Sequence, residues 1–199
     1  MALVTASDVE KTIPGLTAAN IDSDAIDEAE ELIAIHCGYP PATPAARATM
    51  ESTTYTRVIT GRGGRDLIVD VWPVTAEGAI RDDPTQDWTD DAYLVDAGDY
   101  AVNEDGTGVR LTSTSTHGSW STGEGQIRAT WTAGYATAPP ALRRAIVELV
   151  KHLLQRHKTQ GASSTSSKAG SSSKKDEQHG IPVEIRSKLS SFRLPRTVL

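Results

Sequence analysis

The sequence predicts an α+β fold: a small α-helical bundle with a β-rich, hairpin-containing insertion and an extended C-terminal tail. Three observations support this fold. Apolar residues recur at helical spacing near both ends of a body expected to span residues 1–158. Between them, over about residues 50–132, apolar and polar residues alternate with a period of two. Residues 159–180 then hold seven serines and three glycines without apolar periodicity, the composition of a flexible linker before residues 181–199.

Two helices are expected near the N-terminus, over residues 5–14 and 23–38. Ser7 and Glu10 have the spacing of a capping box, and Pro14 with Gly15 ends the first helix. Asp22 or Ser23 caps the second helix, and Gly38 suits its left-handed end. The second helix turns one apolar face toward the core and places its glutamates largely away from it. That face consists of Ile26, Ala29, Ile33 and Cys37, and the glutamates are Glu28, Glu30 and Glu31.

Short strands follow, separated by turns rich in glycine, asparagine and aspartate. The segment 61–64 joins the first two strands, and 103–106 is the clearest hairpin turn. Residues 81–91 and 113–125 are expected to be polar loops, and two or three of the four tryptophans (72, 88, 120 and 131) are expected to pack in the core. The predicted strands are 53–59, 66–72, 92–95, 100–102, 109–111 and 126–131.

A third helix is predicted over residues 139–158, beginning at Pro139 and Pro140, where a missing N–H costs nothing. Its apolar stripe is Leu142, Ala145, Ile146, Leu149, Val150 and Leu153. Beyond the linker, Val183, Leu189 and Phe192 can form one apolar face. A tether that ends in an apolar and basic peptide is typical of a segment that binds a partner.

Charge is divided unevenly along the chain, whose net charge is −6. Residues 1–138 carry 8 Lys and Arg against 22 Asp and Glu, whereas residues 139–199 carry 12 against 4. An acidic body repels nucleic acid, and a basic end favours an acidic surface. The one cysteine excludes an intramolecular disulfide and a multi-cysteine zinc site. No membrane-length apolar run and no secretory signal are visible, so we expect synthesis in the cytoplasm and no membrane partner.

Signatures of catalysis are absent or weak, and neither a cofactor, a metal nor a catalytic residue is predicted. The chain has no nucleophile elbow, HExxH motif, Walker loop or dinucleotide-binding glycine pattern. His117 stands among serines, where a polar loop is favoured over a catalytic triad. Five aspartates form either a solvated acidic loop, which is favoured, or a site for a hard cation: Asp82, Asp83, Asp87, Asp90 and Asp91.

Four local patterns occur in order: His36-Cys-Gly-Tyr39, Gly61-Arg-Gly-Gly-Arg-Asp66, Ala129-Thr-Trp-Thr-Ala-Gly-Tyr135 leading into Pro139-Pro-Ala-Leu-Arg-Arg-Ala, and Phe192-Arg-Leu-Pro-Arg196. In this order the chain resembles the head–tail connector (adaptor) proteins of tailed bacteriophages. The resemblance implies a structural, non-enzymatic virion protein of the neck, located at the head–tail interface. It implies a ring, a dodecamer in that family, around the channel through which DNA passes without specific binding.

The same resemblance implies two partners besides further copies of the chain: the portal protein on one side and a stopper or tail-completion protein on the other. The portal-docking residues would be Ile181, Ile185, Leu189, Phe192, Arg193, Leu194, Arg196 and Leu199. Those packing the ring would be Leu142, Ile146, Leu149 and Leu153. Three alternatives remain: a stopper or tail terminator, an acidic metal-dependent hydrolase that uses the 82–91 loop, and a terminase-type DNA-binding subunit, against which the acidic body argues.

Overall fold

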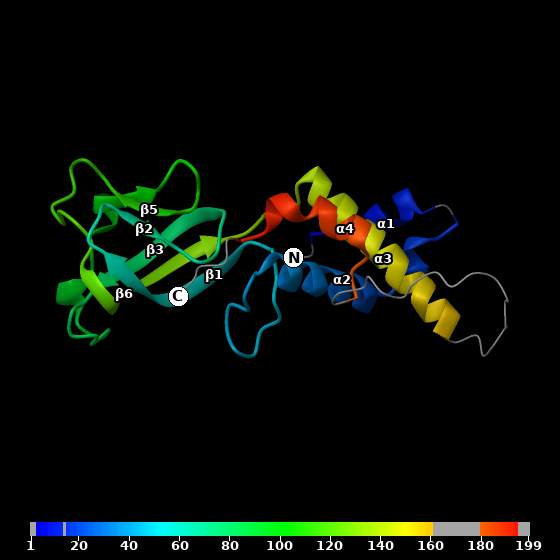
Figure 1. Cartoon of the computed structure of the whole chain (residues 1–199), viewed down its shortest axis with the longest axis horizontal. Coiled ribbons are helices and arrows are strands. Elements are labelled where there is room, and N and C mark those ends of the chain that lie inside the picture. The colour runs from blue at the N-terminus through cyan, green and yellow to red at the C-terminus, as the bar shows by residue number, and fades with distance from the viewer. Residues whose placement is uncertain (1–2, 14, 161–179, 195–199) are drawn as a thin grey trace. The chain divides into compact units, whose positions relative to one another are not determined.

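The computed structural model describes residues 3–13, 15–160 and 180–194. Within them, four α-helices and two three-stranded antiparallel sheets confirm the predicted α+β class (Figure 1). The chain divides into two compact units. The described residues up to Pro40 and from Ala136 onward form one, here called the helical unit, and Pro41–Tyr135 form the other, the strand unit.

The first helix, α1 (Ala6–Thr12), begins two residues earlier than the predicted capping box would place it. The residue at the N-cap is Thr5, whose hydroxyl accepts a hydrogen bond from the Asp8 backbone N–H at 3.3 Å. The Asp8 carboxylate in turn accepts from the Thr5 N–H at 3.0 Å. Asp8 therefore fills the N3 position of the box, and the prediction that Ser7 and Glu10 form it was wrong.

The second helix, α2 (Ser23–Cys37), has the predicted ends: the Asp22 side chain caps its N-terminus, and Gly38 follows with φ 88°. Its predicted apolar face is buried. The placement of Glu30 away from the core was wrong, since Glu30 is 6% exposed and its Oε1 accepts from the Val4 N–H at 3.0 Å. Burial raises the pKa of the Cys37 thiol to about 12, so this cysteine serves as a small apolar core residue.

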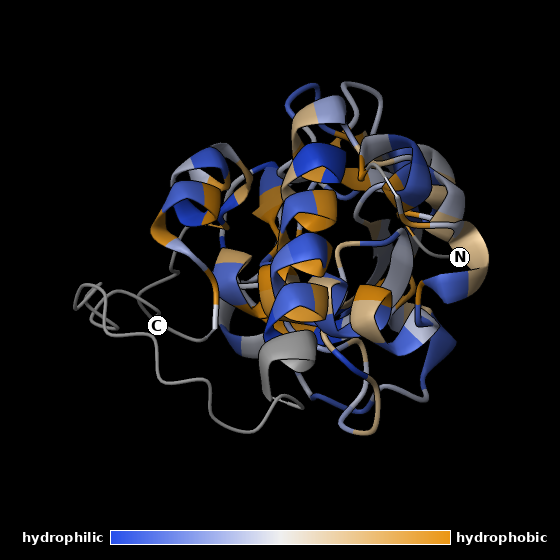
Figure 2. Cartoon of the chain, turned by 90° about the vertical axis from the view of Figure 1, so that its right-hand side faces the viewer, coloured by the Kyte–Doolittle hydropathy of each residue, from blue (hydrophilic) through white to orange (hydrophobic). Residues whose placement is uncertain are grey.

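The long helix α3 (Pro140–Gln160) and the short helix α4 (Val183–Lys188) complete the helical unit. Hydrophobic and hydrophilic residues occupy different sides of the helices, as Figure 2 shows. Every residue of the predicted apolar stripe of α3 is buried, and Val147, which periodicity did not include, is buried as well. The core of this unit lies where α3 packs against α1, α2 and α4.

In the strand unit, the first sheet has the order β1-β6-β3, with β1 (Thr53–Arg62) and β3 (Val74–Asp82) on either side of β6 (Thr122–Ala133). The sequence did not predict β3. It carries Gly78 in its middle, and its pairing with β6 is interrupted by two register shifts, so it lacks a regular alternation. Predicting residues 81 and 82 as part of a polar loop was therefore wrong, because both belong to this strand.

The second sheet has the order β2-β5-β4, built from β2 (Asp66–Ile68), β5 (Gly108–Leu111) and β4 (Tyr100–Val102). The hairpin turn at 103–106 is confirmed, because β4 and β5 pair directly across it. By contrast, β1 and β2 belong to different sheets, so the 61–64 segment is not a hairpin turn. The strand predicted over 66–72 ends at Ile68, and 92–95 begins within a 3-10 turn (Asp91–Tyr93) rather than a strand.

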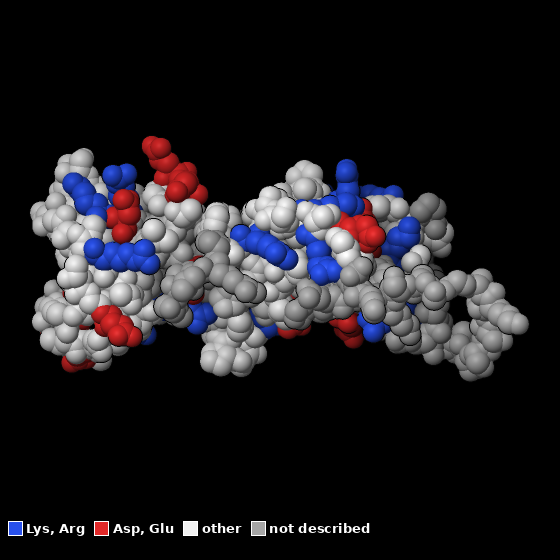
Figure 3. Space-filling view, in the orientation of Figure 1, with Lys and Arg blue, Asp and Glu red and all other residues white. Residues whose placement is uncertain are grey.

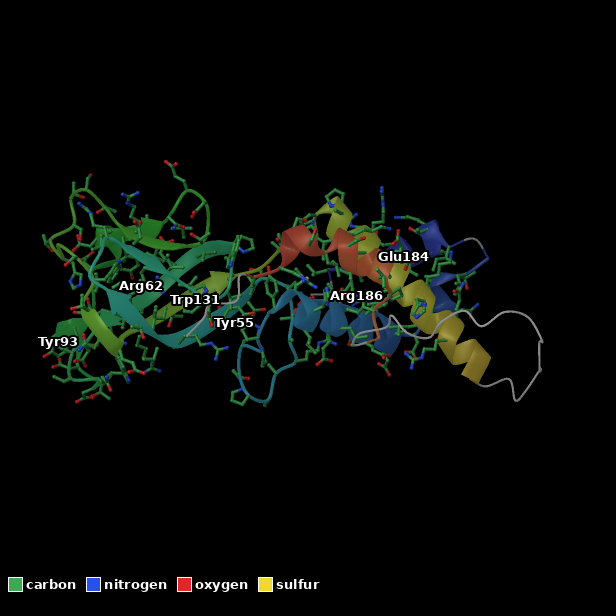
Figure 4. The ribbon with its side chains drawn as sticks, viewed as in Figure 1. Tyr55, Arg62, Tyr93, Trp131, Glu184 and Arg186 are labelled. Carbon is green, nitrogen blue, oxygen red and sulfur yellow. The ribbon has the colours of Figure 1, made fainter. Side chains whose placement is uncertain are left out.

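Two tryptophans organise the core of the strand unit. Trp131 on β6 faces Tyr55 of β1 across the ladder, and the two rings stack with centroids 6.1 Å apart (Figure 4). Its Nε1–H donates to the Val71 carbonyl at 3.2 Å. Trp120 is buried too, with its Nε1–H donating to the Arg65 carbonyl at 3.0 Å. The other two tryptophans are only half-buried, so two of the four are core residues.

Candidate partner-binding surfaces

The C-terminal segment, predicted to reach a partner, packs on its own helical unit between residues 181 and 189. Ile181 and Leu189 are fully buried and Ile185 is 4% exposed, because α4 lies against α3. At the surface of this contact, Lys188 Nζ lies 2.5 Å from the Glu148 carboxylate. The burial of these three large aliphatic side chains stabilises the segment in its position against α3.

The end of the segment is more accessible. The Leu194 N–H donates to the Cys37 carbonyl at 2.8 Å, which fixes the backbone at the end of α2. The Arg193 guanidinium, which is exposed, donates to His36 Nε2 at 2.7 Å. Of the eight residues predicted to dock on the portal, Ile181, Ile185 and Leu189 are buried, Phe192 and Leu194 are half-buried, Arg193 is exposed, and Arg196 and Leu199 lie outside the described residues.

The four residues predicted to pack the ring are core residues of the helical unit. Leu142, Ile146, Leu149 and Leu153 are each at most 2% exposed. They face inward within a single copy of the chain. The described surface that α3 offers to another molecule is therefore mainly polar and includes Arg144 and Lys151, which are exposed.

The acidic segment 82–91 is largely the solvated loop that was favoured, with Asp87, Asp90 and Asp91 exposed, but Asp82 and Asp83 are buried. Asp83 is fully buried, and its Oδ1 accepts from the backbone N–H and the hydroxyl of Thr85, each at 2.7 Å. Asp87 accepts in the same way from Thr89, whose hydroxyl and N–H lower the pKa of that carboxyl. Asp91 pairs with Arg81 at 2.6 Å. In the described part of the chain no three acidic, histidine or cysteine side chains gather as a metal site would require.

His117 and Asp82 form a contact that sequence reasoning did not find, because the strand carrying Asp82 was not predicted. Asp82 is 5% exposed, and its Oδ2 lies 2.8 Å from His117 Nε2. The same oxygen accepts from the Ser121 backbone N–H at 2.9 Å. The imidazole also lies against Trp120, with ring centroids 5.5 Å apart. These contacts hold the segment before β6 against the end of β3.

A histidine beside a buried carboxylate provides two members of a nucleophilic triad, but the hydroxyl that would serve as the nucleophile is not in place beside the ring. The nearby Ser115 Oγ accepts from the His117 backbone N–H at 3.1 Å. Among the described residues, no hydroxyl hydrogen-bonds the imidazole ring. The arrangement is that of a structural clamp.

The helices of the described residues include none whose length and apolar content would let it cross a membrane.

Comparisons with known proteins find a likeness in fold. No protein-family model matches the chain, and no curated protein matches it. Among solved structures, the fold is similar to that of a chain from the virion of a native gene transfer agent (GTA) particle, with a TM-score of 0.54 and 15% sequence identity. The match covers 99% of this chain and 92% of that one. The two chains therefore share a fold over almost their whole length.

Proposed function

We propose that this chain is a structural, non-enzymatic subunit of a virion, and that it forms the adaptor ring between the portal and the stopper or tail. The observation that carries the proposal is the fold shared over 99% of the chain with a chain of a GTA virion. The order of sequence motifs, which resembles that of phage connector proteins, supports the finer assignment to the neck.

The charge of the strand unit supports a role beside a DNA channel. Residues 41–135 carry 14 Asp and Glu against 7 Lys and Arg. Lysine and arginine contacts are what hold nucleic-acid phosphates, so a surface with an excess of carboxylates lets DNA pass without adhering. The hydrolase alternative gains no support, since the carboxylates of Asp83, Asp87 and Asp91 are each used by local donors or by an arginine.

The portal contact is assigned to the exposed end of the C-terminal segment. Three aliphatic residues of this segment are buried in the helical unit, so a partner cannot reach them without unfolding α4. The two arginines near the end of the segment, Arg193 and Arg196, are the residues suited to an acidic portal surface.

Labelling the protein in assembled particles tests the proposal. An epitope tag is inserted at the exposed turn at Gly15, which lies outside the clamp and where a side chain would meet nothing within 4 Å. Gold-labelled antibody should then mark one place on each particle, the junction of head and tail. Label spread over the head shell or along the tail would refute the adaptor assignment, and untagged particles give the background.

A further inference from the structure

The outer side of α2 is an acidic stripe with an exposed isoleucine in it. Asp24, Glu28, Glu31 and Ile35 follow one another at intervals of four, three and four residues, so they lie along one side of the helix. Asp24 and Glu28 are exposed, Glu31 is half-exposed, and 51% of Ile35 is accessible. We call these four residues the α2 stripe.

The α2 stripe has no compensating cation within the part of the chain that the structure describes. Among the described residues, no lysine or arginine forms an ion pair with Asp24, Glu28 or Glu31. Asp24 and Glu28 are four residues apart, a spacing at which like charges repel on a helix surface. A basic surface that docks there would relieve this repulsion and cover Ile35.

The helical unit offers such a surface on α3 and α4. Arg144 and Lys151 are exposed one above the other on the outer side of α3, seven residues apart. Glu148 between them is neutralised by Lys188 of α4. At the start of α4, Val183 is 46% exposed. Figure 3 shows Lys and Arg groups gathered over α3 and α4. We call Arg144, Lys151, Lys188 and Val183 the α3–α4 face.

The α2 stripe and the α3–α4 face lie on opposite sides of the helical unit. The side of α2 opposite its stripe is buried, and so is the side of α3 opposite Arg144 and Lys151, because the two helices pack together through these sides. One folded unit thus carries an acidic surface on one side and a basic surface on the other. Surfaces that are complementary but different produce head-to-tail contacts, which close into a ring when the rotation between copies allows it.

We propose that the α2 stripe of one copy docks on the α3–α4 face of the next copy, with Ile35 and Val183 as the apolar centre of the contact. Closure of these contacts into a ring rests on the proposed function, whereas the contact itself rests only on the two surfaces. A second copy is favoured over nucleic acid as the partner of the α3–α4 face, since that face includes the exposed apolar Val183, which Ile35 of another copy can cover and a phosphate backbone cannot.

Charge reversal tests the contact on the full-length chain by sedimentation velocity. The wild type should associate at low salt and dissociate as salt screens the charges. Glu28→Lys with Glu31→Lys, or Arg144→Glu with Lys151→Glu, should weaken the association constant about tenfold or more, since attraction becomes repulsion. All four residues lie on the surface, and circular dichroism verifies the fold of each variant.

The sharpest test combines the two pairs of charge reversals, one on each surface, in a single chain. A chain that carries all four substitutions has a basic α2 stripe and an acidic α3 side, so head-to-tail association should return. An equimolar mixture of the two single-surface variants should also associate. Glu77→Lys with Glu104→Lys, on exposed sites of the strand unit, is the control for net charge and should leave association unchanged.

Several results would overturn the proposal. The first is a wild type that stays monomeric at low salt. The second is a four-substitution chain that does not regain head-to-tail association. The third is a control variant that weakens association as much as the charge reversals on the two surfaces do. Duplex DNA binding that is lost on reversal of Arg144 and Lys151, with self-association intact, would assign the basic face to nucleic acid instead. None of these results changes where the antibody label falls on the particle, so the adaptor assignment is judged separately.

Discussion

Replacing Leu189 with alanine tests whether the C-terminal segment belongs to the folded helical unit. Leu189 has no exposed surface and closes the contact between α4 and α3. The substitution removes three buried carbon groups, a transfer loss of about 2.4 kcal/mol at 0.8 kcal/mol for each group. The cavity left behind adds to this, so the free energy of unfolding should fall by about 3–5 kcal/mol.

Two spectroscopic probes report the two units separately in a urea titration. All of the described α-helices lie in the helical unit, so far-ultraviolet circular dichroism follows that unit. All four tryptophans lie in the strand unit, so tryptophan fluorescence follows the other: residues 72, 88, 120 and 131. Leu189→Ala should lower the midpoint of the dichroism transition. A fluorescence midpoint that stays constant would show that the two units unfold independently, and one that moves with it would show that they are coupled.

The matched control is Val183→Ala, which truncates an aliphatic side chain of the same segment that is 46% exposed. It should change the free energy of unfolding by less than about 0.5 kcal/mol. If Leu189→Ala is equally silent, the segment is not docked on α3, and the reasoning from burial fails. Ile181, Ile185 and Leu189 would then be free to take part in the predicted portal contact.

Three further predictions concern single positions. Gly134 has φ 106°, and a Cβ there would lie 2.8 Å from the Met50 carbonyl oxygen, so Gly134→Ala should lower fluorescence-detected stability by about 1–3 kcal/mol. Gly64→Ala is the control: a Cβ there would meet only the Asp66 backbone nitrogen, at an ordinary contact distance of 3.9 Å, so stability should stay within about 0.5 kcal/mol. Asp82→Ala removes the carboxylate that contacts the His117 imidazole and accepts from the Ser121 N–H. The free energy of unfolding measured by tryptophan fluorescence should fall by about 1–3 kcal/mol. An unchanged fluorescence midpoint would contradict the clamp. Burial raises the pKa of Cys37 to about 12, so a thiol reagent at pH 8 should label it only after urea is added; rapid labelling of the native protein would show that the helical unit opens.

Local patterns were sufficient for the helices and for the β4–β5 hairpin. A helix is held by contacts between neighbours in the sequence, so Asp22, Gly38 and the apolar periodicity of α3 carry its signal. The 103–106 turn joins strands that pair directly, so its signal is also local. Local patterns still gave the wrong capping box for α1, because Thr5 and Asp8 form it rather than Ser7 and Glu10, which lie two residues further along.

The candidate surfaces were less accessible to sequence reasoning. Apolar residues at 181–189 indicated that the segment binds something, but a pattern of apolar residues is the same whether the surface it meets belongs to another protein or to its own α3. The same holds for Leu142 and Leu149, which hydrophobicity alone assigns equally well to an intersubunit contact or to an internal core. Only packing distinguishes these cases.

Local sequence patterns were enough to specify the α+β class, the caps of α2, the apolar face of α3 and the division of charge between an acidic body and a basic end. Tertiary packing was needed to show that β1 pairs with β6 rather than with β2, that Asp82 contacts His117, and that Glu30 is buried with its carboxylate accepting from the Val4 N–H. The physical reason is separation along the chain. Strand partners about seventy residues apart and a carboxylate that receives a distant N–H are selected by the free energy of the whole packed unit, which no local pattern encodes.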